Sequence, residues 1–197
     1  LMTITIVPVD EGTLEIVISQ SGETLDTMAA MREAKARGAR VLAIVNVVGS
    51  SIAREADDVL YTWAGPEIAV ATTKAYSTQL AMVALLALYL ADARGTIAPE
   101  RYAQLVAELE RLPEKVAKVL ENQKEIQYFA SQFFNHDSIF FIGRNLDYAV
   151  GLEGSLKLKE ISYIHSEAYA SGELKHGTIS LIEPGTQVVA LGAYTPL

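Results

Sequence analysis

Short apolar runs alternate with amphipathic stretches over the first part of the chain. Residues 24–36 carry apolar side chains at the spacing of one helix face, which predicts a helix. The flanking apolar runs predict strands at 14–18, 40–45 and 58–62. Strands that alternate with short helices favour a parallel sheet, and ligands of such sheets bind beyond the carboxyl ends of the strands. Residues 1–9 alternate Thr and Ile and are interpreted as a further short strand at a sheet edge.

Longer helical segments follow, and then the strand pattern returns. A helix is predicted from Thr72 to about Ala91, and nearly all of its positions are apolar. We therefore expect it to be buried on most sides, against the sheet and a partner subunit or domain. Further helices are predicted over 99–112 and 113–134, and strands at 138–142 and 187–191.

This repetition predicts two similar lobes. We place the first, with its connecting helices, at residues 1–112 and the second at 113–197. Each lobe is expected to be α/β, with a parallel sheet flanked by helices in three layers (α-β-α). We expect both lobes to be incomplete, the first at its amino-terminal side and the second at its carboxy-terminal side.

Composition removes several classes of function. The 197 residues are 50% hydrophobic, which is ample for a core, and a formal net charge of −8 argues against a nucleic-acid surface. The sequence has no cysteine, which excludes disulfides, thiolate metal sites and a cysteine nucleophile within it. Its three histidines lack ligand spacing, so we expect no metal and no cofactor. The longest uncharged run, 75–91, is shorter than the roughly 20 apolar residues of a membrane helix, and no signal peptide is visible. We therefore expect a cytoplasmic protein without membrane contact.

A polar turn between the first strand and the first helix is a candidate anion site. Residues 19–24 read Ser-Gln-Ser-Gly-Glu-Thr and offer three hydroxyls. These groups and the unpaired N–H groups at a helix start can surround a phosphate. The alternative is an ordinary N-cap, which uses one hydroxyl. The turn matches neither common phosphate-binding fingerprint, so residue chemistry alone leaves both interpretations open.

A second group of ionisable residues lies in the second lobe. Glu153, Lys157 and Glu160 are spaced i, i+4, i+7 and share one face of a predicted helix. Without other information such a set is more often a solvated ion-pair ladder than a site. Residues 163–177 mix ionisable groups with small residues, unlike a packing segment, and a lone histidine such as His176 is usually structural.

Four stretches, taken in order, resemble the isomerase region of the glutamine:fructose-6-phosphate aminotransferase family, which is built from two SIS (sugar isomerase) domains. They are residues 19–24, 67–75, 152–160 and 172–177, and the resemblance extends over about 14–189. It implies a double SIS fold and the isomerising transfer that makes glucosamine 6-phosphate from fructose 6-phosphate for amino-sugar synthesis.

The resemblance also implies roles for single residues. It implies that the hydroxyl and amide side chains of one turn bind the 6-phosphate of a hexose. These residues are Ser19, Gln20, Ser21 and Thr24. The segment from Val70 to Thr72 would contact the sugar, with Thr72 standing where a serine is expected. Glu160 would move the proton between C1 and C2, Lys157 would be its companion, and His176 would open the sugar ring across a dimer interface. A carboxylate base and a group that titrates near neutral pH suit these steps.

Departures from the family pattern shape the remaining expectations. The family's glutaminase domain, with its catalytic cysteine, has no counterpart in these residues. The family's first sugar-binding loop and its tail lysine, which forms a Schiff base, have no counterpart either. We expect a homodimeric chain, truncated at both ends, that by itself is weakly active or inactive. Two alternatives remain: a non-catalytic phosphosugar-binding SIS module, and a fructosamine-6-phosphate deglycase. Lys157, Glu160 and His176 together favour the enzyme, because a binding module would not need them.

Overall fold

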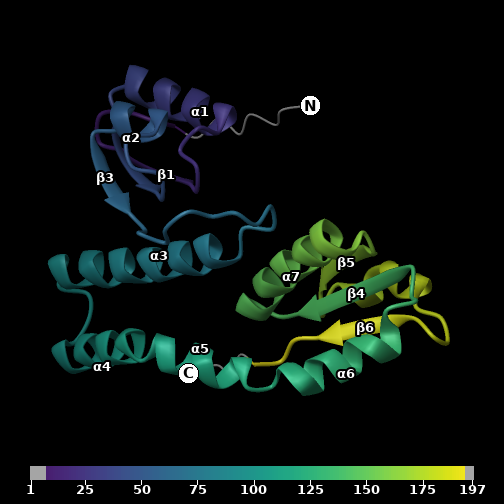
Figure 1. Ribbon diagram of the computed structural model, residues 1–197. Helices are drawn as coiled ribbons and strands as arrows, with labels where there is room; N and C mark the ends of the chain where they lie inside the picture. Colours follow the sequence, from purple (N-terminus) through teal and green to yellow (C-terminus); the bar gives the residue numbers. More distant parts are fainter. Residues whose placement is uncertain (1–7, 194–197) are drawn as a thin grey trace. The chain divides into compact units, whose positions relative to one another are not determined.

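The computed structural model describes residues 8–193, which form two compact units that divide between Leu112 and Pro113 (Figure 1). The strand predicted at 1–9 falls mainly on residues outside the described range, and Pro8 and Val9 have no regular structure. The first unit contains β1 (Leu14–Ser19), α1 (Leu25–Ala36), β2 (Arg40–Val45), α2 (Ser51–Glu55), β3 (Asp58–Tyr61), α3 (Thr73–Ala93) and α4 (Pro99–Glu110).

The sheet of the first unit is parallel, with the order β1-β2-β3. Ser19 pairs with Val45, and Val45 pairs with Tyr61, so the three strands end level with one another. The loops that follow the strands therefore lie along one edge. The turn at residues 19–24 is one of these loops.

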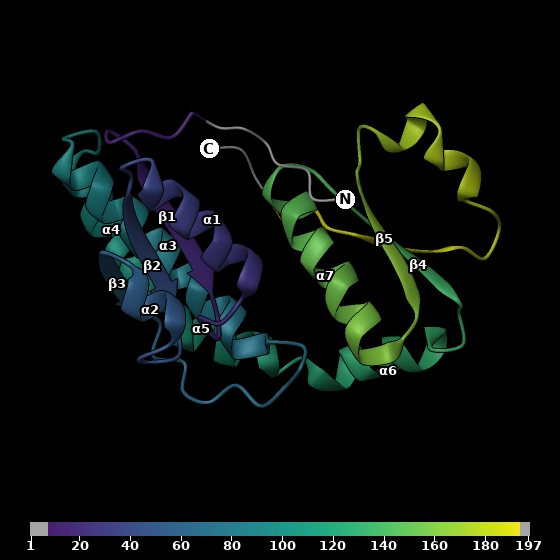
Figure 2. The same cartoon turned by 90° about the horizontal axis from the view of Figure 1, so that it is seen from above.

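β2 is the centre of the core in this unit. Its residues 41–45 are all buried, and three of them, Val41, Ala43 and Val45, pack in one cluster with Met28 and Met31 from α1 and Ile52 from α2. Figure 2 shows these two helices beside the sheet. Burying an aliphatic or Met side chain contributes about 1.5–3 kcal/mol, so this cluster is sufficient to hold the helices on the sheet. An uninterrupted apolar run is what a central strand covered on both faces requires.

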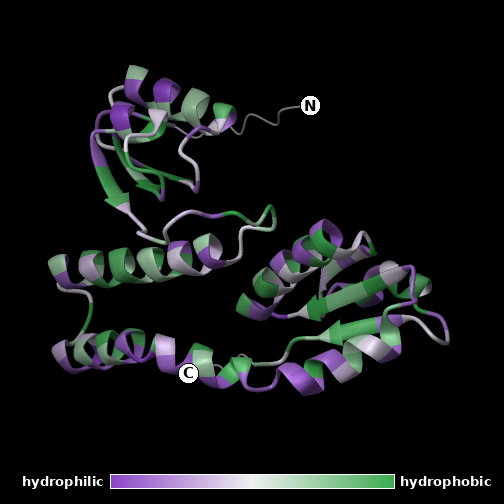
Figure 3. Cartoon of the chain, in the orientation of Figure 1, coloured by the Kyte–Doolittle hydropathy of each residue, from purple (hydrophilic) through white to green (hydrophobic). Residues whose placement is uncertain are grey.

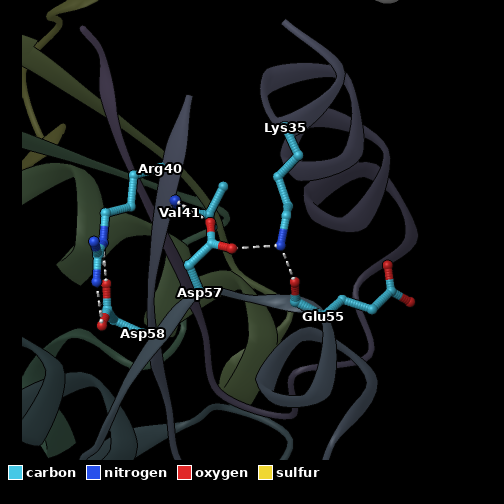
Figure 4. A network of polar contacts seen from close by, with 6 residues as sticks. All are labelled: Lys35, Arg40, Val41, Glu55, Asp57 and Asp58. Atoms are coloured by element: carbon cyan, nitrogen blue, oxygen red, sulfur yellow. Dashed lines mark hydrogen bonds and ion pairs between the residues drawn. The ribbon is translucent and has the colours of Figure 1, made fainter. Parts of the chain in front are cut away.

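Ion pairs fasten the opposite edge of this sheet, where β2 and β3 begin (Figure 4). Lys35 Nζ, near the end of α1, donates to Asp57 Oδ1 at 2.8 Å and to the carbonyl oxygen of Glu55 at 2.6 Å. Asp57 Oδ2 accepts the backbone N–H of Val41 at 2.8 Å, and Arg40 makes a two-point contact with Asp58. These contacts hold the first residues of β2 and β3. The polar loops lie at the opposite edge, where the strands end.

The long apolar helix α3 corrects one expectation. Figure 3 colours it largely hydrophobic, yet within this chain Ala75 is its one buried residue, and Leu80, Val83, Leu85 and Tyr89 are exposed. Contrary to the prediction, the described part of the chain therefore does not by itself bury α3 on most sides. By length and composition α3 is also apolar enough to cross a membrane, contrary to the estimate from the uncharged run, although a single such helix is weak evidence for a span.

The second unit has a smaller core. It contains α6 (Gln123–Phe133), β4 (Ser138–Gly143), α7 (Leu146–Ser162), β5 (His165–Ala170), two 3-10 turns (Leu174–His176 and Thr178–Leu181) and β6 (Gln187–Ala190), and α5 (Leu112–Leu120) begins at the boundary. Its sheet is parallel with the order β5-β4-β6, and α7 packs on β4 and β5 (Figure 2).

One sequence prediction in this unit is wrong: the single helix predicted at 113–134 is two helices, because the chain turns at Glu121 and Asn122. Strand β5, within residues 163–177, was not predicted. The prediction of an α/β fold with parallel sheets flanked by helices is confirmed.

Candidate functional site

The turn between β1 and α1 is held by its own hydroxyl groups. Ser19 Oγ is buried, accepts the N–H of Gly22 at 3.0 Å, and shares a hydrogen bond of 3.0 Å with Thr24 Oγ1. Ser21 Oγ accepts the N–H of Glu23 at 3.2 Å. Because a hydroxyl that accepts keeps its hydrogen, Ser21 still has a proton to donate. Ser19 acts as the inner support, while Ser21 and Thr24 lie nearer the surface.

The N-cap interpretation of Thr24 is not what the structure shows. Thr24 occupies the N-cap position of α1, but its side chain makes no capping hydrogen bond and contacts Ser19 instead. The N–H groups of the first turn of α1 therefore keep their capacity to bind an anion. Asp26 in that turn opposes an anion by its charge. A bound phosphate would depend on the hydroxyls and N–H groups at close range.

The segment after β2 holds the turn from behind. The N–H of Asn46 donates to the carbonyl oxygen of Gln20 at 3.1 Å, and the N–H of Ile52 donates to that of Gly22 at 3.0 Å. Gly22 has a φ of +67°, and a Cβ placed there would lie 2.0 Å from Ser50 Oγ. Only glycine meets both conditions. Ser50 Oγ is buried without a hydrogen-bond partner in the part of the chain that the structure describes.

Glu23 fastens the same turn with its side chain. Its Oε1 accepts the N–H of Ser51 at 2.7 Å, at the start of α2. This backbone hydrogen bond lowers the pKa of the Glu23 carboxyl, aided by the Ser51 side chain and the charge of Arg54. The carboxylate is therefore ionised at neutral pH and bound to a backbone N–H of the protein itself. Glu23 thus holds the turn to the start of α2.

The predicted sugar-contacting segment leads into α3. Val70 is 91% exposed, and Thr72 is partly buried with a left-handed backbone at φ 52°. Thr72 Oγ1 donates to the carbonyl oxygen of Val70 at 3.2 Å. Such a conformation is uncommon for a β-branched residue and is typically kept where the surroundings enforce it. No hydrogen bond joins this segment to residues 19–24 within residues 8–193.

The acidic and basic residues of α7 pair with one another along one face of the helix. Lys157 Nζ lies 2.6 Å from Glu160 Oε2 and 3.4 Å from Glu153 Oε1, and the three side chains are 23%, 31% and 24% exposed respectively. The hydrogen bond to Glu160, with the charge of Glu153, raises the pKa of Lys157, which stays protonated. Partial burial allows these charges to act on one another more strongly than at a fully solvated surface. The contacts suit both a structural ladder and an oriented base.

His176 is placed in a turn of the second unit, apart from these contacts. It ends the 3-10 turn Leu174–His176, its side chain is exposed, and its backbone N–H donates to the carbonyl oxygen of Glu173 at 2.9 Å. Within residues 8–193 the structure brings Lys157 and Glu160 together but records no contact from His176 to either. No group of three or more potential metal ligands occurs among these same residues.

Sequence reasoning missed the supports of the turn. Asn46 and Glu23 brace it by hydrogen bonds to partners distant in the sequence, and Ser50 leaves room only for glycine at position 22. A usable signal was present for Asn46, since the residue directly after a parallel strand lies at the ligand-binding edge of the sheet.

Comparisons with known proteins agree with this architecture. The family model described as SIS domain matches residues 2–89 and 132–196. Glutamine–fructose-6-phosphate aminotransferases (isomerizing) of Caldanaerobacter subterraneus and Clostridium tetani are 60% and 61% identical over 96% of the chain, which spans 31% of their length. The solved C-terminal domain of glucosamine-fructose-6-phosphate aminotransferase from Francisella tularensis is 42% identical, with a TM-score of 0.90 over 93% of this chain and 52% of that one.

Proposed function

The chain belongs to the SIS domain family, and we propose that it is the phosphosugar isomerase region of a glutamine:fructose-6-phosphate aminotransferase. In this role it binds fructose 6-phosphate and contributes the isomerisation that leads to glucosamine 6-phosphate. Names of relatives at 60% identity support the aminotransferase over other SIS proteins.

The turn at residues 19–24 is the observation that carries the proposal. Its inner hydroxyl, Ser19, is engaged, while Ser21 and Thr24 keep hydrogen-bonding capacity beside an uncapped helix start. This arrangement suits a dianion bound by neutral donors. Gln20, whose backbone is fixed by Asn46, extends the same group.

The chemical step is assigned to the second unit. Glu160 is proposed to move a proton between C1 and C2, since a carboxylate can act as the base at a carbon next to a C=N bond. Lys157 holds one oxygen of that carboxylate at 2.6 Å and so orients it. His176 is proposed to open the cyclic sugar, and Val70 and Thr72 to contact it.

The assembly follows from the same proposal. We infer a cytoplasmic homodimer in which a partner copy completes the site, and a glutaminase domain elsewhere in the complete enzyme that supplies ammonia. The exposed apolar residues of α3 support a contact with another protein surface.

Calorimetric titration tests the binding proposal. The chain is expected to bind fructose 6-phosphate much more tightly than fructose, because the phosphate provides most of the contacts. Ser21→Ala should weaken fructose 6-phosphate binding by about 1.5–3 kcal/mol, the range for a hydrogen bond to a charged group. Ser131→Ala is a matched control, since Ser131 is exposed and its hydroxyl makes only local contacts: it donates to the carbonyl oxygen of Tyr128 and accepts from Nε2 of Gln132. Equal affinity for fructose and its 6-phosphate would contradict the assignment.

Product analysis separates the alternatives. The complete protein should form glucosamine 6-phosphate from fructose 6-phosphate and ammonia. Cleavage of fructosamine 6-phosphate without that synthesis would indicate a deglycase, and binding without either reaction would indicate a regulatory module.

A further inference from the structure

Asn46 joins the loops that follow all three strands of the first sheet. It comes directly after β2, and its backbone N–H donates to the carbonyl oxygen of Gln20 at 3.1 Å. Its side chain reaches the other way: Nδ2 donates to the carbonyl oxygen of Gly65 at 2.8 Å, while Oδ1 accepts from Thr62 Oγ1 at 3.1 Å and from the N–H of Ala64 at 2.9 Å. One residue thus connects the turn after β1 to the loop after β3.

The amide orientation of Asn46 is determined by its partners. Oδ1 faces a backbone N–H, and Nδ2 faces a carbonyl oxygen, so reversing the amide would set donor against donor and acceptor against acceptor. All three side-chain contacts can be satisfied only by an amide. Aspartate would lose the contact to Gly65, and alanine would lose all three.

The loop that Asn46 holds contains a strained residue. Trp63 has a φ of 53°, a left-handed conformation that costs a bulky residue free energy and persists only where neighbouring contacts enforce it. Asn46 bonds the residues on both sides of it, Thr62 and Ala64. The Trp63 side chain is 77% exposed, so its own burial does not explain the conformation.

The chain beyond this loop has a second anchor. After Gly65 it passes through Pro66 to Glu67, whose Oε2 accepts the N–H of Ala75 at 3.1 Å in the first turn of α3. The segment with Val70 and Thr72 therefore starts from one point held by Asn46 and returns to one held by Glu67. Fixing both ends limits where its side chains can lie.

We propose that Asn46 is a positioning residue for the sugar: it sets the segment containing Val70 and Thr72 relative to the phosphate-binding turn. This inference rests on the proposed function of residues 19–24. The backbone of Asn46 supports the turn, which a side-chain substitution leaves in place. The side chain of Asn46 supports only the loop after β3. Loss of the side chain should therefore damage recognition of the sugar more than recognition of the phosphate.

Titration of the 197-residue chain with inorganic phosphate and with glucose 6-phosphate tests this division. Asn46→Ala is expected to weaken glucose 6-phosphate binding about tenfold, as expected for the loss of well-aligned hydrogen bonds, and to weaken inorganic phosphate binding less than about threefold. Because Trp63 is the single tryptophan, its fluorescence should change in the same variant and report the freed loop. Thr62→Val, which removes one of the three contacts, should shift both signals in the same direction by less.

Matched controls and outcomes keep the two proposals distinct. Asn122→Ala removes an exposed asparagine side chain that makes no capping hydrogen bond, and should change neither affinity. If Asn46→Ala does not fold, the affinity ratio and fluorescence of Thr62→Val decide the question. Equal weakening of both ligands, or of neither, would overturn the role of Asn46. A wild-type chain that binds neither ligand would instead overturn the phosphate-binding turn itself.

Discussion

The central strands of the two units are alike in topology and differ in how they are covered. β2 and β4 each pair in parallel with a strand on either side. Residues 41–45 of β2 are all buried, whereas only Phe140 and Gly143 are buried in β4. Among residues 8–193, Phe140 is the one buried hydrophobic residue of the second unit.

This difference separates two kinds of candidate site. The turn at residues 19–24 is attached to a covered strand and braced from the loop after β2. The side chains of Lys157 and Glu160 lie on a helix over a sheet that is only partly covered. Segments with few buried apolar contacts open more easily, so the binding site should be the more rigid of the two.

The largest effect is expected from the chemistry of the second unit. Glu160→Gln keeps the shape of the side chain and removes the proposed base, so turnover of fructose 6-phosphate with ammonia by the complete protein should fall by about 10²–10⁴, as is typical of general base catalysis. Affinity for hexose 6-phosphate, measured by calorimetry, should change little. A normal rate in this variant would assign the base to another residue, and a matching loss of affinity would undermine the separation of binding from chemistry.

Core substitutions in the two central strands test the contrast directly. Ile44 in β2 is fully buried, and Ile142 in β4 is half-buried. Ile44→Ala should lower the free energy of unfolding by about 2–5 kcal/mol, because it removes buried methyl groups and leaves a cavity. Ile142→Ala should cost no more than about 2 kcal/mol, since less apolar surface is involved. Urea denaturation measures both. Equal losses would show that the second sheet is covered as well as the first.

The smallest effect concerns the ion pairs at the start of β2 and β3. The hydrogen bond from Lys35, with the N–H of Val41, lowers the pKa of Asp57. A lowered folded-state pKa adds stability above the unfolded value of about 3.9, and that contribution is lost as the pH falls through the folded value. Asp57→Asn should therefore be slightly less stable than wild type at pH 7, and the two should converge in acid.

Thermal denaturation at neutral and acid pH measures this dependence. Asp92→Asn is a suitable control, because Asp92 is an exposed residue of α3 for which the described part of the chain shows no ion pair. A constant difference between Asp57→Asn and wild type across the pH range would remove the electrostatic explanation.

Much of the first unit could be predicted from the sequence. Its strands and first helix lie within a residue or so of the predicted bounds, because uninterrupted apolar strands and a helical repeat are strong local signals. β5 was missed for a physical reason. Its one buried position holds a small polar residue, Ser166, whose hydroxyl lies 2.9 Å from that of Ser155 on α7. Because α7 packs closely at this position, a large apolar residue does not fit there. The sequence therefore lacks the apolar run from which a strand is usually predicted.

The supports of the candidate site could not be predicted in the same way. The side-chain partners of Asn46 lie 16–19 residues further along the chain, and the N–H that Glu23 binds lies 28 residues away. Such contacts depend on the register of neighbouring strands, which no local pattern specifies. Residue types in the turn were compatible with an anion site and with an ordinary N-cap; the hydrogen bonds that support the turn became visible only in three dimensions.

The contact between Gly22 and Ser50 also limits how this sequence can drift. No side chain fits at position 22 while Ser50 keeps its place, since a Cβ would lie 2.0 Å from one Ser50 atom and 2.5 Å from another. A larger residue at position 50 would in turn press on the turn that Gly22 closes. The two loops therefore do not vary independently. Position 22 should stay glycine whatever residue stands at position 50, because its φ of +67° strains any other residue, and position 50 should stay small because it lies against Gly22.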